Sequence, residues 1–493
     1  MSQDVAPHPV EGREVAVAVR NGLKLGGSVL VTSAVAMIVK LQVPIHLGPV
    51  RQGHFGFSDS FATLFFTCVG LGVDTYLLKE ASVRRDHASD VVGGAFALRS
   101  VMSVVVLAAM TATLWITRRP TETVLTAAVF GVAFLAMTNN NTLTVVLQTA
   151  SRVGWVAVSN IAAKLAWGVG LLIGLHFDAP LPVLAGTYLA SELLRTAMLV
   201  PAARREAELR YRVDAPAVRS ALAASLPYFV NDLALGVLGS LGVSVLEFVG
   251  SDEEVGWFAA DQNVSYLCML LGPLLMWVVM PMLSRAYARS EAEGLSMLRR
   301  SVEGIVIVVA PLTVLTSAGA DVLVRVFHDK YAPAATGLSI LSLVFVMTYI
   351  DTMLAIALTI MGKGWSVTFI SIGSVFLNAL LIVAFVPVGR RLLGVGGECA
   401  GAAAAVIATE VFVLIGMVSR FKDSPLDRRV TGVLAKSVMI GAIVLYADRR
   451  LRSMGASRLA VDALLYVALA LAVRVVTIGG LRGALRVVRS RGS

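Results

Sequence analysis

The sequence has 493 residues, of which 57% are hydrophobic and only 15% are charged, and its mean hydropathy is +0.79. Water-soluble domains keep far more charge, and runs of about 20 apolar residues are typical of membrane spans, so this composition excludes an ordinary soluble enzyme or binding domain. The net charge of +10 does not indicate a nucleic-acid partner, because membrane proteins collect Lys and Arg in cytoplasmic loops. We expect an integral membrane protein that binds no nucleic acid.

The first 15 residues, MSQDVAPHPVEGREV, are polar and lack the apolar core and cleavage site of a signal peptide. We therefore expect the first membrane span to be retained, with residues 1–21 in the cytoplasm. The cysteines Cys68, Cys268 and Cys399 lie in apolar segments without metal-ligand spacing, which favours structural thiols over a metal or disulfide role. No cofactor and no metal are expected.

Apolar runs of about 20 residues predict about 14 transmembrane helices in chain order. Six precede a basic segment at 204–219, and we expect them at 22–47, 55–78, 92–116, 123–148, 155–177 and 182–202. Six follow it, at 220–249, 255–283, 302–324, 334–360, 365–387 and 396–419. A terminal pair is expected at 431–447 and 459–478.

This order predicts an all-α integral membrane protein with two six-helix lobes related by pseudo-two-fold symmetry. The lobes are expected at 22–203 and 220–419, joined by the cytoplasmic linker 204–219. The rest is a cytoplasmic loop, a C-terminal helix pair and a basic cytoplasmic tail, at 420–430, 431–478 and 479–493.

The distribution of Lys and Arg predicts the topology. If the N-terminus is cytoplasmic, the inside segments carry 26 of the 42 basic residues and the outside segments carry 11. The other five lie within predicted spans. This asymmetry favours two cytoplasmic termini and an even number of spans.

The chain contains a weak internal repeat at a shift of 200 residues. The shift aligns Gly56 with Gly256 and Phe57 with Trp257, each pair at the outer start of an inward-running span. It also aligns Cys68 with Cys268 and Arg85 with Arg285. Parallel repeats are a known transporter plan, with the substrate site expected between the lobes.

Three consecutive acids, Asp252, Glu253 and Glu254, stand in the stretch VGSDEEVGWFAAD at the second copy of this repeat. Clustered carboxylates can bind metal or serve acid–base chemistry. The predicted topology instead puts them in a short outer turn, where we expect all three to be hydrated and to stabilise the N-terminus of the following helix. The first copy, GHFGFSDSF, has no such triplet, so the element shared by the repeats is the Gly-aromatic step.

Several segments resemble the signatures of a known transporter family. The stretch at 48–85, GPVRQGHFGFSDSFATLFFTCVGLGVDTYLLKEASVRR, and the stretch at 251–287, SDEEVGWFAADQNVSYLCMLLGPLLMWVVMPMLSRAY, resemble the first and second signatures of bacterial polysaccharide flippases. The stretches at 329–345, 361–365 and 378–405 resemble the later signatures of the same family. The chain is similar to the oligosaccharide/polysaccharide transporter family, whose superfamily also holds multidrug/toxin extruders and lipid II flippases.

The resemblance implies a flippase with no enzymatic activity. Its expected task is to move undecaprenyl-diphosphate-linked oligosaccharide repeat units from the inner to the outer leaflet of the bacterial inner membrane, by alternating access. Such lipids feed O-antigen, capsule or exopolysaccharide assembly, so other glycan-assembly membrane proteins are expected partners, beside membrane lipid. The family often has an acid in the seventh span about 11 positions before the second signature. Here GSLGVSV at 239–245 has none.

Four cations within the predicted spans of the first lobe are candidates to bind the diphosphate: Lys40, Arg99, Lys164 and Arg195. Alternatives are that Arg99 and Arg195 snorkel to the interface, or that Arg195 pairs with Glu192 at i,i+3 spacing. Asn140, in an Asn triplet at 139–141, is a candidate for sugar binding, with interhelical packing as the alternative.

Five acids are candidates for ion coupling, with internal salt bridges or hydrogen bonds as the alternative: Asp74, Asp232, Asp261, Asp351 and Glu410. The GECAG stretch at 397–401 has the spacing of a close helix-packing face.

Three other functions stay open. A multidrug/toxin extruder would handle organic cations, for which acids should dominate the cavity. A lipid II flippase would share the diphosphate. A membrane glycan polymerase or ligase is expected to carry a sizeable outer loop, and the longest outer segment predicted here has about ten residues.

Overall fold

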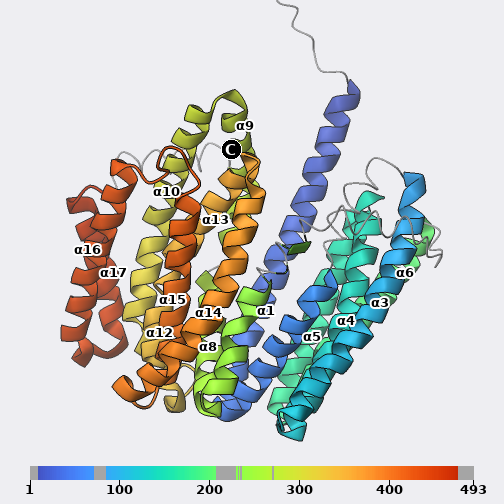
Figure 1. Cartoon of the computed structure of the whole chain (residues 1–493), viewed down its shortest axis with the longest axis horizontal. Helices are drawn as coiled ribbons and strands as arrows, with labels where there is room; N and C mark the ends of the chain where they lie inside the picture. The colour runs from blue at the N-terminus through green and yellow to red at the C-terminus, as the bar shows by residue number, and fades with distance from the viewer. Residues whose placement is uncertain are drawn as a thin grey trace, which may run out of the picture. The chain divides into compact units, whose positions relative to one another are not determined.

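The computed structural model describes residues 9–70, 85–150, 152–206, 229–230, 233, 236–268 and 271–475. Within these ranges the regular structure is helical throughout (Figure 1). Among the described residues, eleven helical segments are long and apolar enough to cross a membrane, and the shorter apolar helix Gly236–Val249 lies in the seventh predicted span, 220–249. The prediction of an all-α integral membrane protein is confirmed.

The chain divides into two compact units. The first comprises Met1–Leu47 and Ser58–Ser240, and the second comprises Gly48–Phe57 and Leu241–Ser493. The segment Gly48–Phe57 belongs to the second unit although the residues on both sides of it belong to the first. It lies in α1 (Pro9–Phe66), which is two helices that meet at Gly48. Gly48 has a φ of 70° and a ψ of 170°, a backbone conformation that glycine adopts without the steric cost of a Cβ atom.

Four further helices of the first unit follow one another through short turns. They are α3 (Arg85–Ile116), α4 (Thr121–Thr149), α5 (Val153–His176) and α6 (Leu181–Glu206), and η1 (Thr67–Gly70) precedes them. Helix α4 packs mainly on α6 and α3, and α5 packs on α6. Large apolar side chains such as Trp115 and Phe177 are exposed at the helix ends, as expected of a surface that faces lipid.

The second unit contains α8 to α17. Its helices are α8 (Asp252–Cys268), α9 (Leu271–Arg289), α10 (Glu291–Ala318), α11 (Ala320–Arg325), α12 (Ala334–Leu341), α13 (Val344–Ile360), α14 (Gly364–Leu393), α15 (Gly397–Val418), α16 (Arg428–Arg450) and α17 (Arg458–Ala472). Short 3₁₀ turns, η2 (Asp329–Tyr331) and η3 (Arg452–Ser457), interrupt them. Buried side chains of α10, α13 and α16, including Val306, Met353 and Ile440, form its main apolar core.

Helices α14 and α15 approach each other through glycines. A Cβ atom on Gly397 would lie 2.2 Å from the carbonyl oxygen of Gly389, and one on Gly401 would lie 2.5 Å from that of Phe385. The prediction that GECAG forms a close helix-packing face is therefore confirmed, because only hydrogen fits at these positions.

A buried ion-pair cluster fixes the terminal helix pair on the second unit. Arg458, at the start of α17 and 2% exposed, donates from Nε to Asp448 of α16 at 2.5 Å and pairs with Asp321 of α11. It also donates to the carbonyl oxygen of Ala318, the last residue of α10, at 3.3 Å. Since a buried guanidinium is costly without such partners, α16 and α17 are held firmly against α10 and α11.

Candidate functional site

The Gly-aromatic step of the repeat is a backbone-to-backbone contact within the second unit. A Cβ atom on Gly256 would lie 1.9 Å from the carbonyl oxygen of Pro49, and one on Gly53 would lie 2.4 Å from that of Asp252. Trp257 donates from its indole nitrogen to the carbonyl oxygen of Lys330 at 2.9 Å. The motif therefore packs the segment Gly48–Phe57 against α8, and a side chain larger than hydrogen has no room at Gly256.

The prediction that all three acids of the stretch are hydrated is wrong for Glu254. Its side chain is buried, and its two oxygens accept from the backbone nitrogens of Gly396 at 2.6 Å and Cys399 at 2.8 Å. Glu254 thus caps the N-terminus of α15 from a neighbouring helix. Burial raises the pKa of the Glu254 carboxyl more than these two hydrogen bonds lower it.

The cap is reciprocal. Glu398, in the first turn of α15, accepts from the backbone nitrogen of Ser251 at 2.7 Å, just before α8, and pairs with Arg390 of α14. Asp252 remains half-exposed beside His54, with 3.2 Å between Oδ2 and Nε2, and Glu253 is exposed. We call Ser251, Glu254, Arg390 and Glu398 the outer clasp. Its two buried carboxylates, those of Glu254 and Glu398, are engaged by backbone nitrogens at the ends of neighbouring helices.

The first unit brings together two of the predicted cations. Lys40 lies 3.9 Å from Asp59, across the turn at Gly48, and both side chains are more than one-third exposed. The Lys164 ammonium lies 4.0 Å from the centre of the Trp167 ring, a cation–π contact. Lys164 also interacts electrostatically with Lys40, Asp59 and Glu192. Helices α1, α5 and α6 therefore contribute to one charged cluster within the first unit.

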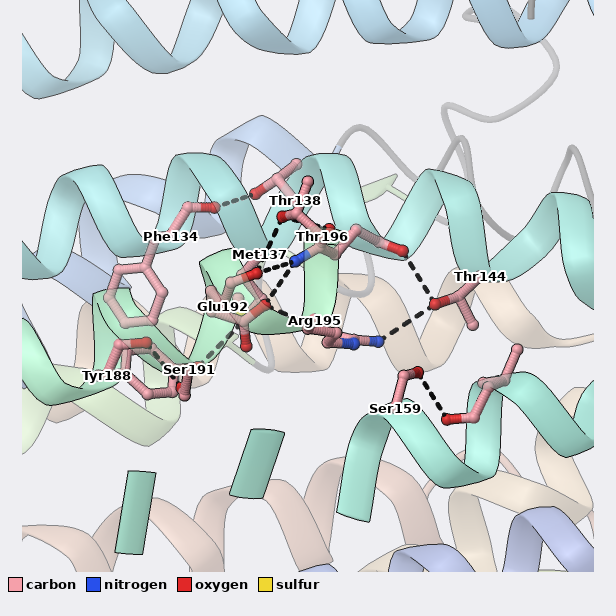
Figure 2. Close-up of polar contacts among 12 residues, drawn as sticks. Phe134, Met137, Thr138, Thr144, Ser159, Tyr188, Ser191, Glu192, Arg195 and Thr196 are labelled. Carbon is pink, nitrogen blue, oxygen red and sulfur yellow. Dashed lines mark hydrogen bonds and ion pairs between the residues drawn. The ribbon is translucent and has the colours of Figure 1, made fainter. Parts of the chain in front are cut away.

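Helices α4 and α6 extend this cluster with a hydrogen-bonded network (Figure 2). Asn140, fully buried on α4, donates to the carbonyl and carboxylate oxygens of Glu192, each at 2.9 Å, and accepts from Thr196 at 2.9 Å. Arg195 pairs with Glu192 at 3.6 Å and donates to Thr144 at 3.1 Å. The i,i+3 pair expected from the sequence is present, and Asn140 joins the two helices.

Figure 2 also shows Tyr188, one turn before Glu192 on the same helix. Its hydroxyl donates to the sulfur of Met137 at 3.2 Å, and its ring meets that of Phe134 edge-on at 5.8 Å. The ring therefore separates the charged cluster from the apolar part of the α4–α6 contact.

Arg99 has a different environment from the other three cations. Its side chain is completely buried, so it does not snorkel to an interface. Its guanidinium donates to Thr142 of α4 and to the carbonyl oxygen of Gly70, each at 2.6 Å. These bonds tie α3 to α4 and to η1, and a role of Arg99 in binding the diphosphate stays a prediction.

The candidate acids fall into three groups. Asp74 and Asp232 lie outside the described residues. Asp261 is fully buried in α8, and the Cys399 thiol donates to it at 3.3 Å. Asp351 on α13 and Glu410 on α15 interact electrostatically with each other, and Glu410 also with Thr348. Within the described ranges, His, Cys, Asp and Glu side chains form no group of three or more that fits a metal ion.

Two contacts of the structure were not predicted from the sequence. Asp59 is 19 positions from Lys40 and on another helix, so no helical spacing links them; the turn at Gly48 brings them together. The outer clasp joins residues 142 to 147 positions apart. The glutamates of the second signature were the only sequence feature that pointed to the clasp. A run of acids in the sequence does not show which side chains reach water and which cap a helix.

Comparison with known proteins agrees with this architecture. The family described as "Polysaccharide biosynthesis protein" matches residues 18–287, more than half of the chain. No curated protein sequence matches significantly.

Solved structures with the same fold are distant in sequence. The lipid II flippase MurJ, in an inward closed conformation, has a TM-score of 0.69 at 10% identity, covering 90% of this chain and 97% of MurJ. An inward-facing multidrug resistance MATE family transporter of the MOP superfamily has a TM-score of 0.59 at 15% identity, covering 78% and 98%. A MOP superfamily transporter from Pyrococcus furiosus has a TM-score of 0.54 at 15% identity, covering 80% and 94%.

These matches confirm the predicted family and the predicted fold. They place the chain among multi-pass integral membrane proteins. The chain therefore belongs to the polysaccharide biosynthesis protein family and has the fold of the MOP superfamily of transporters.

Proposed function

We propose that the protein flips undecaprenyl-diphosphate-linked oligosaccharide repeat units from the inner to the outer leaflet of the bacterial inner membrane, by alternating access. Both termini are cytoplasmic in this proposal, and the product feeds O-antigen, capsule or exopolysaccharide assembly. The observation that supports it most is the partly exposed pair of Lys40 and Asp59 in the first unit, 3.9 Å apart, together with the nearby ammonium of Lys164. Two ammonium groups from different helices suit a ligand that itself carries several negative charges.

The charge balance of this cluster favours an anion. Among the residues that the structure describes, Lys40, Lys164 and Arg195 are seen to interact with two carboxylates, those of Asp59 and Glu192. A diphosphate offers acceptor oxygens to two lysines acting as point charges, and Arg195 can bind it through its planar guanidinium. Lys40 and Asp59 are the exposed members, so a ligand reaches the cluster without breaking a buried contact.

The pair Asp351 and Glu410 supports coupling to a proton in the second unit. Asp351 and Glu410 are acids on α13 and α15, two helices that pack against each other inside the predicted spans. Loading and release of that proton would give transport a driving force. Asp261, hydrogen-bonded to Cys399, is a second candidate for this role.

Organic cations and lipid II are the two alternative cargoes. An extruder of organic cations should line its site with acids, and the first unit has an excess of cations instead. A lipid II flippase would bind the same diphosphate, so the cluster suits both lipids. Family membership in polysaccharide biosynthesis favours the glycan repeat unit.

A complementation experiment separates the three. The full chain is expressed in one strain that lacks its own glycan-repeat flippase and in another depleted of its lipid II flippase. We expect lipid-linked glycan to reach the outer leaflet in the first strain and growth to stay arrested in the second. Rescue of the second strain alone, or export of toxic cations without glycan movement, would overturn the proposal.

A further inference from the structure

The corner between α9 and α10, in the second unit, contains a cavity of about 570 Å³. Its lining comes from Met282, Arg285, Ala288 and Arg289 of α9 and from Met297 of α10. The α9 residues stand three, three and one positions apart, so they occupy one face of the helix. The small side chain of Ala288 leaves space between the two arginines and the α10 side.

The corner is a built structure and not a loose loop. Ser290 is the N-cap of α10 and accepts from the backbone nitrogen of Glu293 at 3.1 Å. The Tyr287 ring rests on Gly294, where a Cβ atom would lie 2.4 Å from the ring carbons. These contacts fix the angle between α9 and α10, so the cavity walls keep their positions.

The cavity changes from apolar to basic along α9. Met282 is 39% exposed, and Arg289, seven residues later, is roughly 10 Å further along the helix axis. The next helix, α10, contains a stretch apolar enough to span a membrane, but its first three turns carry Glu291, Glu293, Arg299 and Arg300. The corner thus stands between the predicted spans 255–283 and 302–324. The cavity therefore lies where a bilayer gives way to water, with methionine toward the lipid and arginine toward the headgroups.

The arginines are available to an anion. Arg285 is exposed and uses its Nε to donate to the carbonyl oxygen of Pro281 at 3.2 Å, and within the described part of the chain its two terminal nitrogens bind no other group. Arg289 shares one nitrogen with Glu293 at 3.0 Å on the surface. Two guanidinium groups against one carboxylate leave the cavity with a net positive charge.

We propose that this corner binds one anionic phospholipid of the surrounding bilayer. Its phosphate lies between Arg285 and Arg289, and its glycerol and upper acyl carbons lie against Met282 and Met297. Arginine binds phosphate oxygens bidentately, and methionine adapts its shape to flexible chains. The site consists of residues of the second unit, shares none with the charged cluster of the first unit and does not depend on the proposed cargo.

Native mass spectrometry of the purified full chain tests this site, with phosphatidylglycerol and phosphatidylcholine as probes. We expect one phosphatidylglycerol to be retained more strongly than phosphatidylcholine. Arg285→Gln and Arg289→Gln should each weaken that retention about fivefold. The matched control is Arg300→Gln, which removes an exposed charge outside the cavity. Unfolding temperature confirms that each variant is folded.

Two further arms make the outcome decisive. Arg285→Lys keeps the charge and should retain part of the binding. Glycerol phosphate, the headgroup without chains, should bind far more weakly than the lipid. Equal losses in Arg285→Gln and Arg300→Gln, equal retention of both lipids, or binding of glycerol phosphate as tight as that of the lipid would overturn the proposal.

Discussion

The charged cluster of the first unit and the outer clasp of the second contain the same residue types but use them differently. In the clasp, both oxygens of Glu254 accept backbone hydrogen bonds, and Glu398 is shared between Ser251 and Arg390. In the cluster, Lys40 and Asp59 are 3.9 Å apart and more than one-third exposed. Buried carboxylates that accept backbone hydrogen bonds stabilise the fold, whereas a carboxylate and an ammonium that are both partly exposed and loosely paired have capacity left for a ligand.

The largest effect should come from the glycine beneath the clasp. In Gly256→Ala the new Cβ atom would meet the carbonyl oxygen of Pro49 at 1.9 Å, so two backbones must separate. We expect a loss of about 3 kcal/mol or more in the free energy of unfolding. The control is Gly304→Ala, where a Cβ atom meets nothing within 4 Å and stability should not fall. Equal unfolding temperatures for the two variants would contradict the backbone contact.

Removal of the clasp carboxylate should have the next largest effect. Glu254→Ala leaves the backbone nitrogens of Gly396 and Cys399 without their acceptors, at an expected cost of about 2–3 kcal/mol. Glu253→Ala is the matched control, since Glu253 is an exposed neighbour. Denaturant or thermal unfolding in detergent measures both. If Glu253→Ala is the more harmful change, the clasp is wrongly assigned.

Arg99 gives a contrast inside the first unit. Lysine cannot reach Thr142 and the carbonyl oxygen of Gly70 together, so Arg99→Lys should lower stability by about 1–2 kcal/mol. Transport per folded molecule should stay near the wild-type level, because Arg99 is tied into helix packing. A loss of transport at normal stability would instead indicate that Arg99 binds the cargo.

The smallest effect concerns pH. Because burial raises the pKa of Glu254 in the folded protein above its ordinary value of 4.5, its protonated form is favoured by folding. The stabilisation that depends on this proton is complete below pH 4.5 and is lost as pH rises through the raised folded value. The unfolding temperature of wild type minus that of Glu254→Gln should therefore decrease from about pH 4 to pH 7. An increasing difference would show that the two backbone hydrogen bonds outweigh burial.

Hydropathy predicted the spans well because a membrane helix is specified by its own 20 or so residues. Each predicted range between 92 and 202 has a described helix close to it. The connection between the first two spans was harder to predict from the sequence. The sequence predicts an outer connection between the spans 22–47 and 55–78, but in the structure the two helices meet directly at Gly48, where glycine permits a positive φ.

Side-chain partnerships were predictable only where they are local. The pair Arg195 and Glu192 follows from i,i+3 spacing on one helix. The contact of Glu254 with α15 and that of Lys40 with Asp59 depend on how helices are placed against each other, which composition and periodicity do not encode. The acid triplet illustrates this limit, since one of its three members is a buried cap and the other two reach water.

We propose that the partly exposed cations of the first unit bind the diphosphate of the cargo. The most direct test of this proposal is the rate at which a lipid-diphosphate-linked glycan crosses liposomes that contain the purified chain. Lys40→Ala and Lys164→Ala should each slow transport about tenfold or more with unchanged unfolding temperature, since charge-assisted contacts are worth about 1.5–3 kcal/mol. The control Lys422→Ala, at an exposed lysine of the second unit, should transport normally. Unchanged transport rates in both cluster variants would show that Lys40 and Lys164 do not bind the diphosphate.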